Sequence, residues 1–351
     1  MRLRRPLSAA AALAATAALT LAGCASGGSP EGDGTAAPSG QASGATDEFP
    51  VTIEHALGET VIEAAPERVA TWGWGSTEAA IAAGVYPVAV AEQIFTVGED
   101  ALLPWVEEAY DEAGVEKPTV LSDPESGSTV PYEEFVGAAP DLIVAPYSGL
   151  TQEQYDVLSD IAPVVAYPDG PWTTTWQDTI TLTAQALGRS DAGEQVLADI
   201  DDFVAQKAAE HPEFAGKTFA AIVDDPSKGQ VSVYTAADPR TTFLEGLGVE
   251  NAPSVAELDT SGGGFYFDLS YEELDKLDSD FVVAYAYSDE AAQAFDDNKR
   301  LQAIPAVRDG QVVKVVGPPE VSAVSPPTAL SVYWEDGFPA LVDTMAETLG
   351  D

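Results

Sequence analysis

The chain has 351 residues, 45% of them hydrophobic, which leaves room for two domains with cores of their own. Beyond the N-terminus no apolar run is long enough to span a membrane. With 15 Lys and Arg against 58 Asp and Glu, the formal net charge is −43. Such a chain has no basic stripe that could neutralise phosphates, and this excludes nucleic acid as its ligand.

The N-terminal segment, residues 1–23, has the pattern of an export signal. It begins with the basic stretch MRLRRP, continues with the short apolar run LSAAAALAATAALT and ends in small residues. Cys24, the single cysteine, directly follows LAG. The arrangement resembles the lipobox of bacterial lipoproteins, in which this thiol becomes lipidated; the alternative is an ordinary signal with a chance cysteine. The Arg4-Arg5 pair leaves both the general secretory and the twin-arginine export routes open.

Residues 24–48 are predicted to be a lipidated cysteine followed by a flexible tether. Residues 25–47 contain no Val, Ile, Leu, Met or aromatic residue, so nothing there can be buried to offset the ordering of the backbone. We therefore expect the folded part to begin near Phe49 and to hang from the extracytoplasmic face of a membrane. Removal of residues 1–23 takes away three arginines, and 12 basic against 58 acidic residues leave a mature net charge of −46.

Short apolar runs alternate with helical stretches from Phe49 onward, which is typical of α/β units. Residues 49–187 are assigned to a first lobe that opens with a hairpin around Gly58. The elements predicted after it are strands at 68–74, 85–91, 141–147 and 162–168 and helices at 76–84 and 131–139.

A long helical region follows, from about residue 172 to 211, in which Gly188 and Gly193 suggest a break. Its last helix, assigned to 188–212, is expected to join the lobes as a rigid strut. The pattern then restarts in a second lobe, residues 213–351. The elements predicted there are strands at 217–224, 230–236, 280–287 and 311–317 and helices at 240–248 and 270–277.

One stretch occurs twice, as YEEFVGAAPDLIVA at 132–145 and as YEELDKLDSDFVVA at 271–284, 139 residues later. The repeat predicts an acidic helix start and a buried strand at equivalent places in both lobes. Local helix chemistry is an alternative explanation. Ser270 and Glu273 fit a capping box, Pro131 suits a first helical turn, and carboxylates near a helix N-terminus are favoured by about 0.3–1 kcal/mol.

Aromatic residues cluster just after the predicted strands, at the strand ends where open α/β lobes bind their ligands. The high number of aromatic residues there suits a large, partly apolar ligand, with tyrosine hydroxyls as polar contacts. Because alternate residues of a strand face opposite ways, one of Trp72 and Trp74 is expected to belong to the core. The aromatic candidates for the ligand cleft are Trp72, Trp74, Phe95, Tyr147, Tyr167, Trp172, Tyr234, Tyr285 and Tyr287.

Five arginines remain after removal of the signal, and Arg240 is the first candidate for the cleft because it follows the strand at 230–236. Arg300 is the second. A guanidinium there could donate hydrogen bonds to oxygens that carry partial negative charge, although an ordinary surface arginine remains an alternative. Zinc or manganese sites need clustered ligands, and the two histidines, His55 and His211, are not expected to converge. We therefore predict no metal site and no cofactor.

Several longer stretches resemble the substrate-binding lipoproteins of iron–siderophore ABC importers. They occur in the family's order, after a lipobox and a tether, and span most of the mature chain. They are APERVATWGWGSTEAAIAAGVYPVAV, PDLIVAPYSGLTQEQYDVLSDIAPVVAYPDGPWTTTWQDTITLTAQALG, SYEELDKLDSDFVVAY and LQAIPAVRDGQVVKV. The resemblance implies an α/β fold class of two Rossmann-like lobes joined by a long rigid helix, with the ligand cleft between them.

The same resemblance implies that the protein captures a ferric siderophore already wrapped in its chelator and delivers it, as a monomer, to an ABC permease dimer. Glu133 and Glu272 match the acidic residues with which the family docks onto its permease. The high negative charge slightly favours hydroxamate over anionic catecholate complexes, while haem or cobalamin is the alternative ligand. An enzyme is not expected, since the chain lacks a G-x-S-x-G elbow, a P-loop and an H-E-x-x-H motif.

Overall fold

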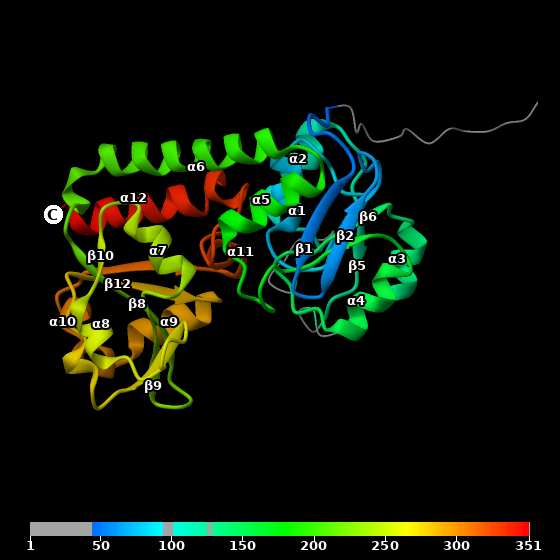
Figure 1. Cartoon of the computed structure of the whole chain (residues 1–351). Helices are drawn as coiled ribbons and strands as arrows, with labels where there is room; N and C mark the ends of the chain where they lie inside the picture. The colour runs from blue at the N-terminus through cyan, green and yellow to red at the C-terminus, as the bar shows by residue number, and fades with distance from the viewer. Residues whose placement is uncertain (1–43, 94–100, 125–126, 128, 351) are drawn as a thin grey trace, which may run out of the picture. The chain divides into compact units, whose positions relative to one another are not determined.

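The structure, a computed structural model, describes residues 44–93, 101–124, 127 and 129–350. The described residues form one compact unit, in which two α/β lobes are joined along one side by a long helix (Figure 1). No helix within these ranges is long and apolar enough to cross a membrane. The signal segment, Cys24 and most of the predicted tether lie outside the described residues.

The N-terminal lobe is built on a five-stranded parallel sheet with the order β5-β4-β3-β6-β7. Its central strands are buried on both faces, as expected for a parallel sheet covered by helices. The strands are β3 (Val69–Thr71), β4 (Ala89–Ala91), β5 (Thr119–Leu121), β6 (Leu142–Val144) and β7 (Val164–Val165). The helices are α1 (Ser76–Ala82), α2 (Pro104–Ala113), α3 (Tyr132–Ala138), α4 (Gln152–Ser159) and α5 (Trp176–Ala186).

The predicted hairpin is confirmed: β1 (Val51–His55) pairs antiparallel with β2 (Gly58–Ile62). The helical region after it divides into α5 and the 21-residue α6 (Ser190–Glu210). Gly188 makes the break, with a φ of 67° and the ring of Phe49 only 2.4 Å from where a Cβ would lie. The expected break at Gly193 is wrong, because Gly193 lies inside α6, where its missing side chain lets α5 approach closely.

The C-terminal lobe holds a mixed sheet with the order β11-β9-β8-β12-β13. Strands β8, β12 and β13 run parallel, β9 and β11 extend the sheet antiparallel, and β10 pairs with the start of β8. The strands are β8 (Thr218–Asp225), β9 (Gln230–Tyr234), β10 (Glu250–Asn251), β11 (Tyr266–Ser270), β12 (Phe281–Ala286) and β13 (Val312–Val316).

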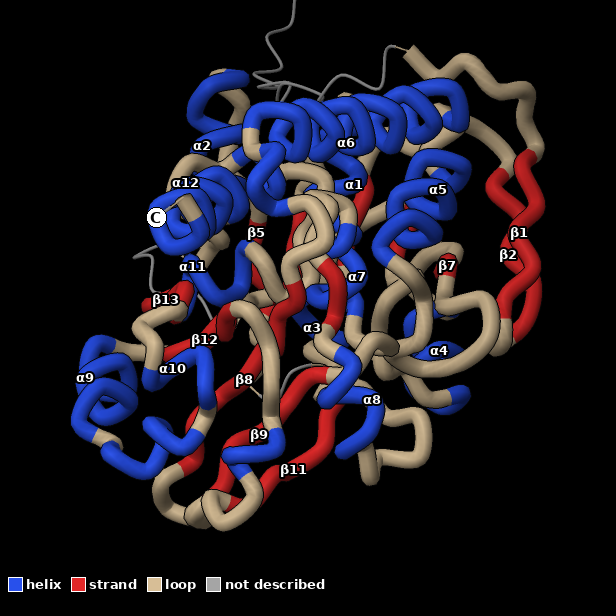
Figure 2. The backbone as a smooth tube through the Cα atoms, turned by 90° about the vertical axis from the view of Figure 1, so that its left-hand side faces the viewer, coloured by secondary structure: helices blue, strands red, loops and turns tan. Residues whose placement is uncertain are grey.

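The helices of this lobe cover both faces of the sheet, and η marks the short 3-10 helices (Figure 2). They are η1 (Pro212–Phe214), α7 (Pro239–Glu245), α8 (Pro253–Leu258), η2 (Leu274–Lys276), α9 (Asp289–Asp297), η3 (Lys299–Ala303), α10 (Pro305–Arg308), α11 (Pro318–Ala323), η4 (Ser331–Tyr333) and α12 (Phe338–Leu349).

The helix predicted at 270–277 is wrong. Only η2 forms there, after a turn at the end of β11, and the expected capping box is absent. The Glu273 carboxylate instead accepts a hydrogen bond from Lys276 at 2.7 Å. The strand that follows the turn forms as expected and is buried along its whole length. The two copies of the repeat therefore have the buried strand in common, but only the first copy forms the helix.

The repeated aspartates explain part of the duplication. In the first lobe Asp141 accepts hydrogen bonds from the backbone N–H groups of Glu67 and Arg68, just before β3. In the second lobe Asp280 accepts a hydrogen bond from the N–H of Thr218, the first residue of β8. Each aspartate stands directly before a strand that pairs parallel with its neighbour. The same carboxylate thus aligns the central strand pair of each lobe.

A continuous apolar core joins the lobes beside α6. It runs from Trp105 in α2 to Phe338 in α12, and the rings of Trp105 and Trp334 lie 5.4 Å apart. Phe203 of α6 packs against the ring of Tyr333 at 5.0 Å. The C-terminal segment therefore adds a second connection between the lobes, and we expect their relative movement on ligand binding to be small.

Glu78 is buried where the lobes meet, with only 1 % of it exposed. It lies in the first turn of α1, and its carboxylate accepts a hydrogen bond from Trp105 Nε1 at 3.0 Å. Burial raises the pKa of Glu78, and hydrogen bonds from Trp105 and Thr328 counteract only part of that effect. The folded protein therefore retains a proton on Glu78 at pH values where the unfolded chain has lost it.

Replacing Glu78 with glutamine is expected to make the protein more stable than wild type above neutral pH. In wild type the folded-state pKa lies above the unfolded value, so the free energy of unfolding falls as pH rises between the two. Glutamine keeps an acceptor for Trp105 and cannot ionise. Thermal unfolding from pH 5 to 9 measures this difference, which should shrink towards pH 5. A gap between the two proteins that does not change with pH would contradict the prediction.

Candidate ligand-binding site

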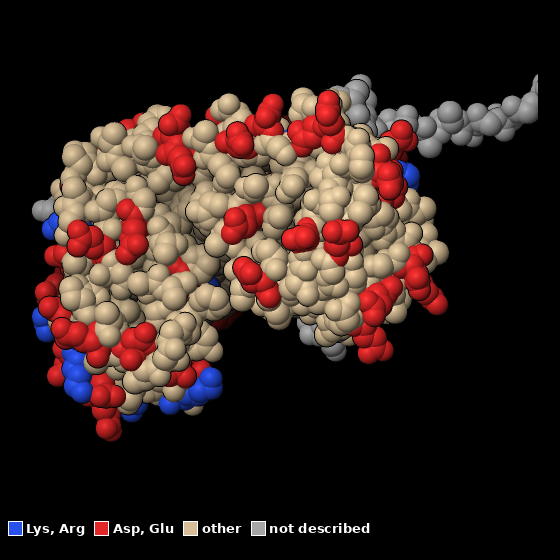
Figure 3. Space-filling model, in the orientation of Figure 1, with Lys and Arg blue, Asp and Glu red and all other residues tan. Residues whose placement is uncertain are grey.

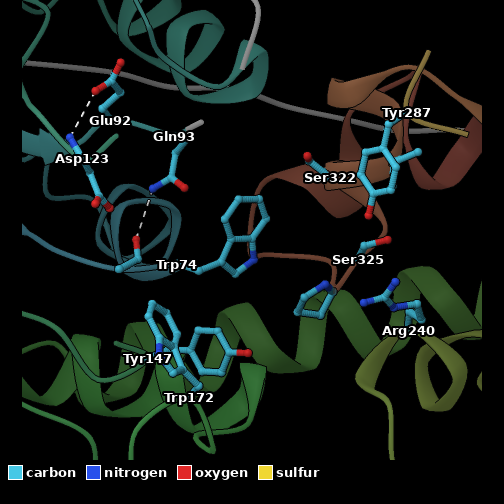
Figure 4. A pocket seen from close by; sticks show the side chains of 13 residues that line it. Trp74, Glu92, Gln93, Asp123, Tyr147, Trp172, Arg240, Tyr287, Ser322 and Ser325 are labelled. Carbon is cyan, nitrogen blue, oxygen red and sulfur yellow. Dashed lines mark hydrogen bonds between the residues drawn. The ribbon is translucent and has the colours of Figure 1, made fainter. Parts of the chain in front are cut away.

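A cavity of about 390 Å³ opens between the two lobes, where the surface is visibly hollowed (Figure 3). Aromatic rings occupy its middle, and charged side chains stand at opposite ends (Figure 4). Its size falls within the range of small-molecule pockets. The lining residues are Gly73, Trp74, Glu92, Gln93, Asp123, Tyr147, Trp172, Arg240, Tyr287, Val321, Ser322, Ser325 and Pro326.

The N-terminal wall is formed by the residues that follow four neighbouring parallel strands. Trp74 comes after β3, Gln93 after β4, Asp123 after β5 and Tyr147 after β6. Carboxyl ends of parallel strands meet at one edge of a sheet, so these side chains converge although they are spread over the sequence.

Trp74 is held by a tight backbone crossing. The carbonyl of Tyr147 accepts a hydrogen bond from the Trp74 N–H at 3.1 Å, and Gly73 has a φ of 87°. A Cβ on Gly73 would lie 2.2 Å from the Tyr147 carbonyl oxygen, so only glycine fits there. Trp74 Nε1 is buried and has no hydrogen-bond partner among the described residues, which leaves a donor at the cavity wall for a ligand oxygen.

Trp172 forms the floor together with Tyr147, with ring centroids 5.4 Å apart and nearly perpendicular planes. It has a φ of 60°, a conformation that non-glycine residues rarely adopt and that is often found at functional sites. A Cβ on Gly149 would lie 2.5 Å from Trp172 Nε1. The absence of a side chain at Gly149 thus gives the indole its place.

Arg240 dominates the C-terminal wall. It lies in the first turn of α7, where the Asp238 side chain caps the helix and accepts a hydrogen bond from Arg240 Nε at 2.6 Å. The guanidinium stacks 3.8 Å from the ring centre of Tyr234, and Tyr285 lies beside it at 5.7 Å. Only 15 % of its side chain is exposed.

The surroundings of Arg240 keep it charged and leave one of its nitrogens available. Burial by itself would lower the pKa of Arg240, but Tyr234 and Asp238 outweigh this and the pKa is raised. Nη1 is buried and makes no hydrogen bond within the described part of the chain. An unpartnered donor on a buried cation is costly, and a ligand oxygen would remove that cost.

The cavity gathers five of the predicted ligand-binding residues, namely Trp74, Tyr147, Trp172, Arg240 and Tyr287. Tyr234 and Tyr285 are buried instead, where they support the Arg240 guanidinium. Phe95 lies outside the described residues.

Trp72, Arg300 and Tyr167 do not line the cavity. Trp72 is fully buried against Phe135, since alternate residues at the end of β3 face opposite sides, and only Trp74 reaches the cavity. Arg300 lies in η3 and stacks on Tyr271, because β12 is followed by α9 and the chain leaves the cleft before it reaches Arg300. Tyr167 is buried and donates its hydroxyl to the carbonyl of Leu150.

Other lining residues were missed by the sequence reasoning. Glu92, Gln93 and Asp123 follow β4 and β5, so the same strand-end rule could have found them had polar residues been considered along with aromatic ones. Ser322 and Ser325 belong to the segment after β13, where no comparable pattern in the sequence points to the cavity. In the described ranges no group of three or more His, Cys, Asp or Glu could hold a metal ion.

A cavity of this kind between two α/β lobes, lined by aromatic rings and few charges, is typical of small-molecule binding proteins. The chain belongs to the periplasmic binding protein family, which it matches over residues 69–316. Because the members of this family bind solutes, the protein is a binding protein and not an enzyme.

Individual relatives agree with this assignment. The chain is 27% identical over 247 residues to the "Probable siderophore-binding lipoprotein YfiY" of Bacillus subtilis, covering 69% of this chain and 70% of the relative. Among solved structures, Streptococcus pneumoniae PiaA in complex with ferrichrome aligns with a TM-score of 0.72 and 29% identity, over 86% of this chain and 99% of that chain. A periplasmic solute binding protein of Mycobacterium smegmatis aligns with a TM-score of 0.70 and 27% identity, over the same shares. The resemblance and fold class expected from the sequence are confirmed.

Proposed function

We propose that the protein captures a ferric siderophore outside the cytoplasm and delivers it to an ABC permease. One observation carries the proposal: the buried Arg240, with Nη1 unpartnered among the described residues, borders an aromatic cavity shared by both lobes. A ferric chelate presents polarised oxygens at its iron and an apolar periphery. The names of YfiY and of the PiaA–ferrichrome complex support this class of ligand.

Binding in this scheme involves no covalent chemistry. Arg240 donates a hydrogen bond to an iron-bound oxygen, and the rings of Trp74, Tyr147 and Trp172 cover the apolar parts of the chelator. The chelator occupies the coordination sites of the iron, so the protein supplies no iron ligand. A hydroxamate complex is slightly favoured. Acidic side chains are spread over the visible face of both lobes, which is unfavourable for an anionic tris-catecholate (Figure 3).

The proposal includes anchoring and delivery. Lipidation of Cys24 holds the monomeric protein at the cell membrane, and residues 25–47 give it reach. Glu133 and Glu272 then contact the two subunits of the permease, one for each lobe.

The repeated glutamates suit this role. Glu133 and Glu272 are exposed, and neither forms a side-chain hydrogen bond or ion pair with any residue that the structure describes. Their neighbours are engaged: Glu134 accepts hydrogen bonds from Ser122, and Glu273 accepts one from Lys276. In each repeat, therefore, the first glutamate remains available to a partner.

Both free glutamates also stand at equivalent edges of their sheets. Glu133 follows the edge strand β5 and opens α3, whereas Glu272 follows the edge strand β11, whose last residue pairs with the first residue of β9. The turn before Glu272 is fixed, because Tyr271 donates a hydrogen bond to Asp224 and Asn298 donates to both. Burial, together with the Asp224 carboxylate, raises the pKa of Tyr271 to about 12, so this hydroxyl remains a donor.

Tryptophan fluorescence of residues 40–351, titrated with ferric hydroxamate, ferric catecholate, haem and cobalamin, tests the proposal. We expect saturable quenching by a ferric chelate. Replacing Trp172 with phenylalanine should reduce the quenching amplitude and weaken binding by about three- to tenfold, the worth of one aromatic contact.

Trp334 provides the matched control, since it packs against Trp105 in the interlobe core. Its replacement with phenylalanine should leave the affinity unchanged. A response to haem or cobalamin, with none to either siderophore, would show that the site binds a macrocycle. The siderophore proposal would then be wrong.

A further inference from the structure

The two ends of the cavity carry opposite charge. Glu92 and Asp123 stand on one side of Trp74, and Arg240 stands on the other (Figure 4). Arg240 is balanced by Asp238, with which it forms an ion pair. The carboxylate end has no such balance, because neither Glu92 nor Asp123 pairs with a cation in the part of the chain that the structure describes.

The shortage of cations extends to the whole N-terminal lobe. Between residues 49 and 187 the sequence contains two basic residues, Arg68 and Lys117. Arg68 donates to the carbonyls of Ala138 and Ala139, and Lys117 forms an ion pair with Glu107. Neither lines the cavity. Among the described residues, therefore, no cation of this lobe lines the wall that carries the two carboxylates.

The surroundings of Asp123 are the main evidence that a ligand group binds at this end of the cavity. Only 5 % of it is exposed, yet it lines the cavity. One carboxylate oxygen accepts a hydrogen bond from the N–H of Gly127 at 2.5 Å, and the other has no donor among the described residues. Glu92 accepts a hydrogen bond from the N–H of Asp123 at 3.1 Å, which brings the second carboxylate close.

The proximity of the two carboxylates has an electrostatic cost. Burial raises the pKa of Asp123, the Gly127 N–H partly opposes this, and the charge of Glu92 raises it further. The attraction of a cation placed between the carboxylates would offset the cost of burying Asp123 and reduce the repulsion between the two groups. Iron(III) itself is an unsuitable occupant, because it arrives enclosed by its chelator.

We infer that the cargo is a ferric complex with a pendant cationic group, which Glu92 and Asp123 receive while Arg240 contacts the iron-bound oxygens at the opposite end. The inference rests on the proposed function and narrows its ligand class. The class that combines these features is a linear ferric hydroxamate ending in a primary ammonium group. Such a ligand would lie along the cavity in one orientation. Glu92 and Asp123 repel the iron-bound oxygens, and Arg240 repels the ammonium group.

Ferrioxamine B, a linear trihydroxamate with a terminal amine, and its N-acetylated form make a matched pair of probes. Acetylation removes the positive charge and leaves the iron coordination unchanged. We expect wild type to bind the amine form about tenfold more tightly, on the scale of one partly buried charge pair. The double variant Glu92→Gln/Asp123→Asn should lose this preference by weakening only the amine form. Glu112→Gln, at an exposed site outside the cavity, should keep it.

Four results would overturn the inference. Equal affinity of wild type for the two probes, or no binding of either, would exclude a cation-bearing ligand of this class. The proposed function would still stand in that case if another ferric siderophore binds. A preference that survives in the double variant would mean that other groups receive the amine. Equal loss of both probes in that variant, with an unchanged circular dichroism spectrum, would assign the carboxylates to loop structure alone.

Discussion

Replacing Arg240 with methionine is expected to lower the affinity for a ferric siderophore by about a hundredfold, the scale of one charged, buried hydrogen bond. Methionine preserves much of the volume beside Tyr234 but removes every donor. Lysine keeps the charge and loses the planar contact with the rings of Tyr234 and Tyr285, so Arg240→Lys should be intermediate. The dissociation constants come from the fluorescence titration described above.

Stability must be separated from binding in this experiment. Removal of the guanidinium leaves Asp238, which is 2 % exposed, without its ion-pair partner. The double variant Asp238→Asn/Arg240→Met removes that unpaired charge while an amide oxygen can still cap α7. Arg300→Met is the matched control, because Arg300 stacks on Tyr271 away from the cavity. Unchanged affinity in both Arg240 variants would exclude a role for this residue in ligand binding.

Reversing both docking charges, with Glu133→Arg and Glu272→Arg together, is expected to abolish uptake of the siderophore while binding remains at wild-type affinity. Each single reversal should reduce uptake by about tenfold or more, because like charges opposed at an interface cost several kcal/mol. Uptake of radiolabelled iron by cells that carry the cognate permease measures transport, and the titration measures binding.

The control for net charge uses two other exposed glutamates, one in each lobe. Glu63→Arg together with Glu290→Arg changes the total charge equally but alters neither repeat. This pair should transport normally. If the control pair loses uptake as strongly as the docking pair, the effect is due to net charge. If the docking pair also loses ligand binding, Glu133 and Glu272 are needed for the fold.

The strands and the helices at 76–84, 131–139 and 240–248 could be predicted from the sequence, whereas the helix expected at 270–277 does not form. Buried apolar runs such as Phe281–Ala286 are continuous in the sequence and become strands covered on both faces. The segment 270–277 carries the residues of a helix start, yet it becomes a turn and η2, because Tyr271 is bound to Asp224 and Asn298. Contacts far apart in the sequence overrode the local preference.

The cavity lining was only partly predictable, because contacts between residues far apart in the sequence decide which side chains meet there. The strand-end rule located Trp74, Tyr147, Trp172, Arg240 and Tyr287, all of which line the cavity. The rule fixes where a strand ends but not the side to which each residue points.

By itself the sequence determined the class of this protein, with two α/β lobes and a connecting helix, and it predicted an export signal and a lipobox, since these features depend on composition and on patterns within short segments. Only the tertiary structure decided which rings face the cavity, that Asp238, Tyr234 and Tyr285 hold Arg240 in place, and that Glu92 and Asp123 oppose it across the cavity. Charge placement across a cleft depends on how two sheets are turned towards each other, and no local pattern encodes that.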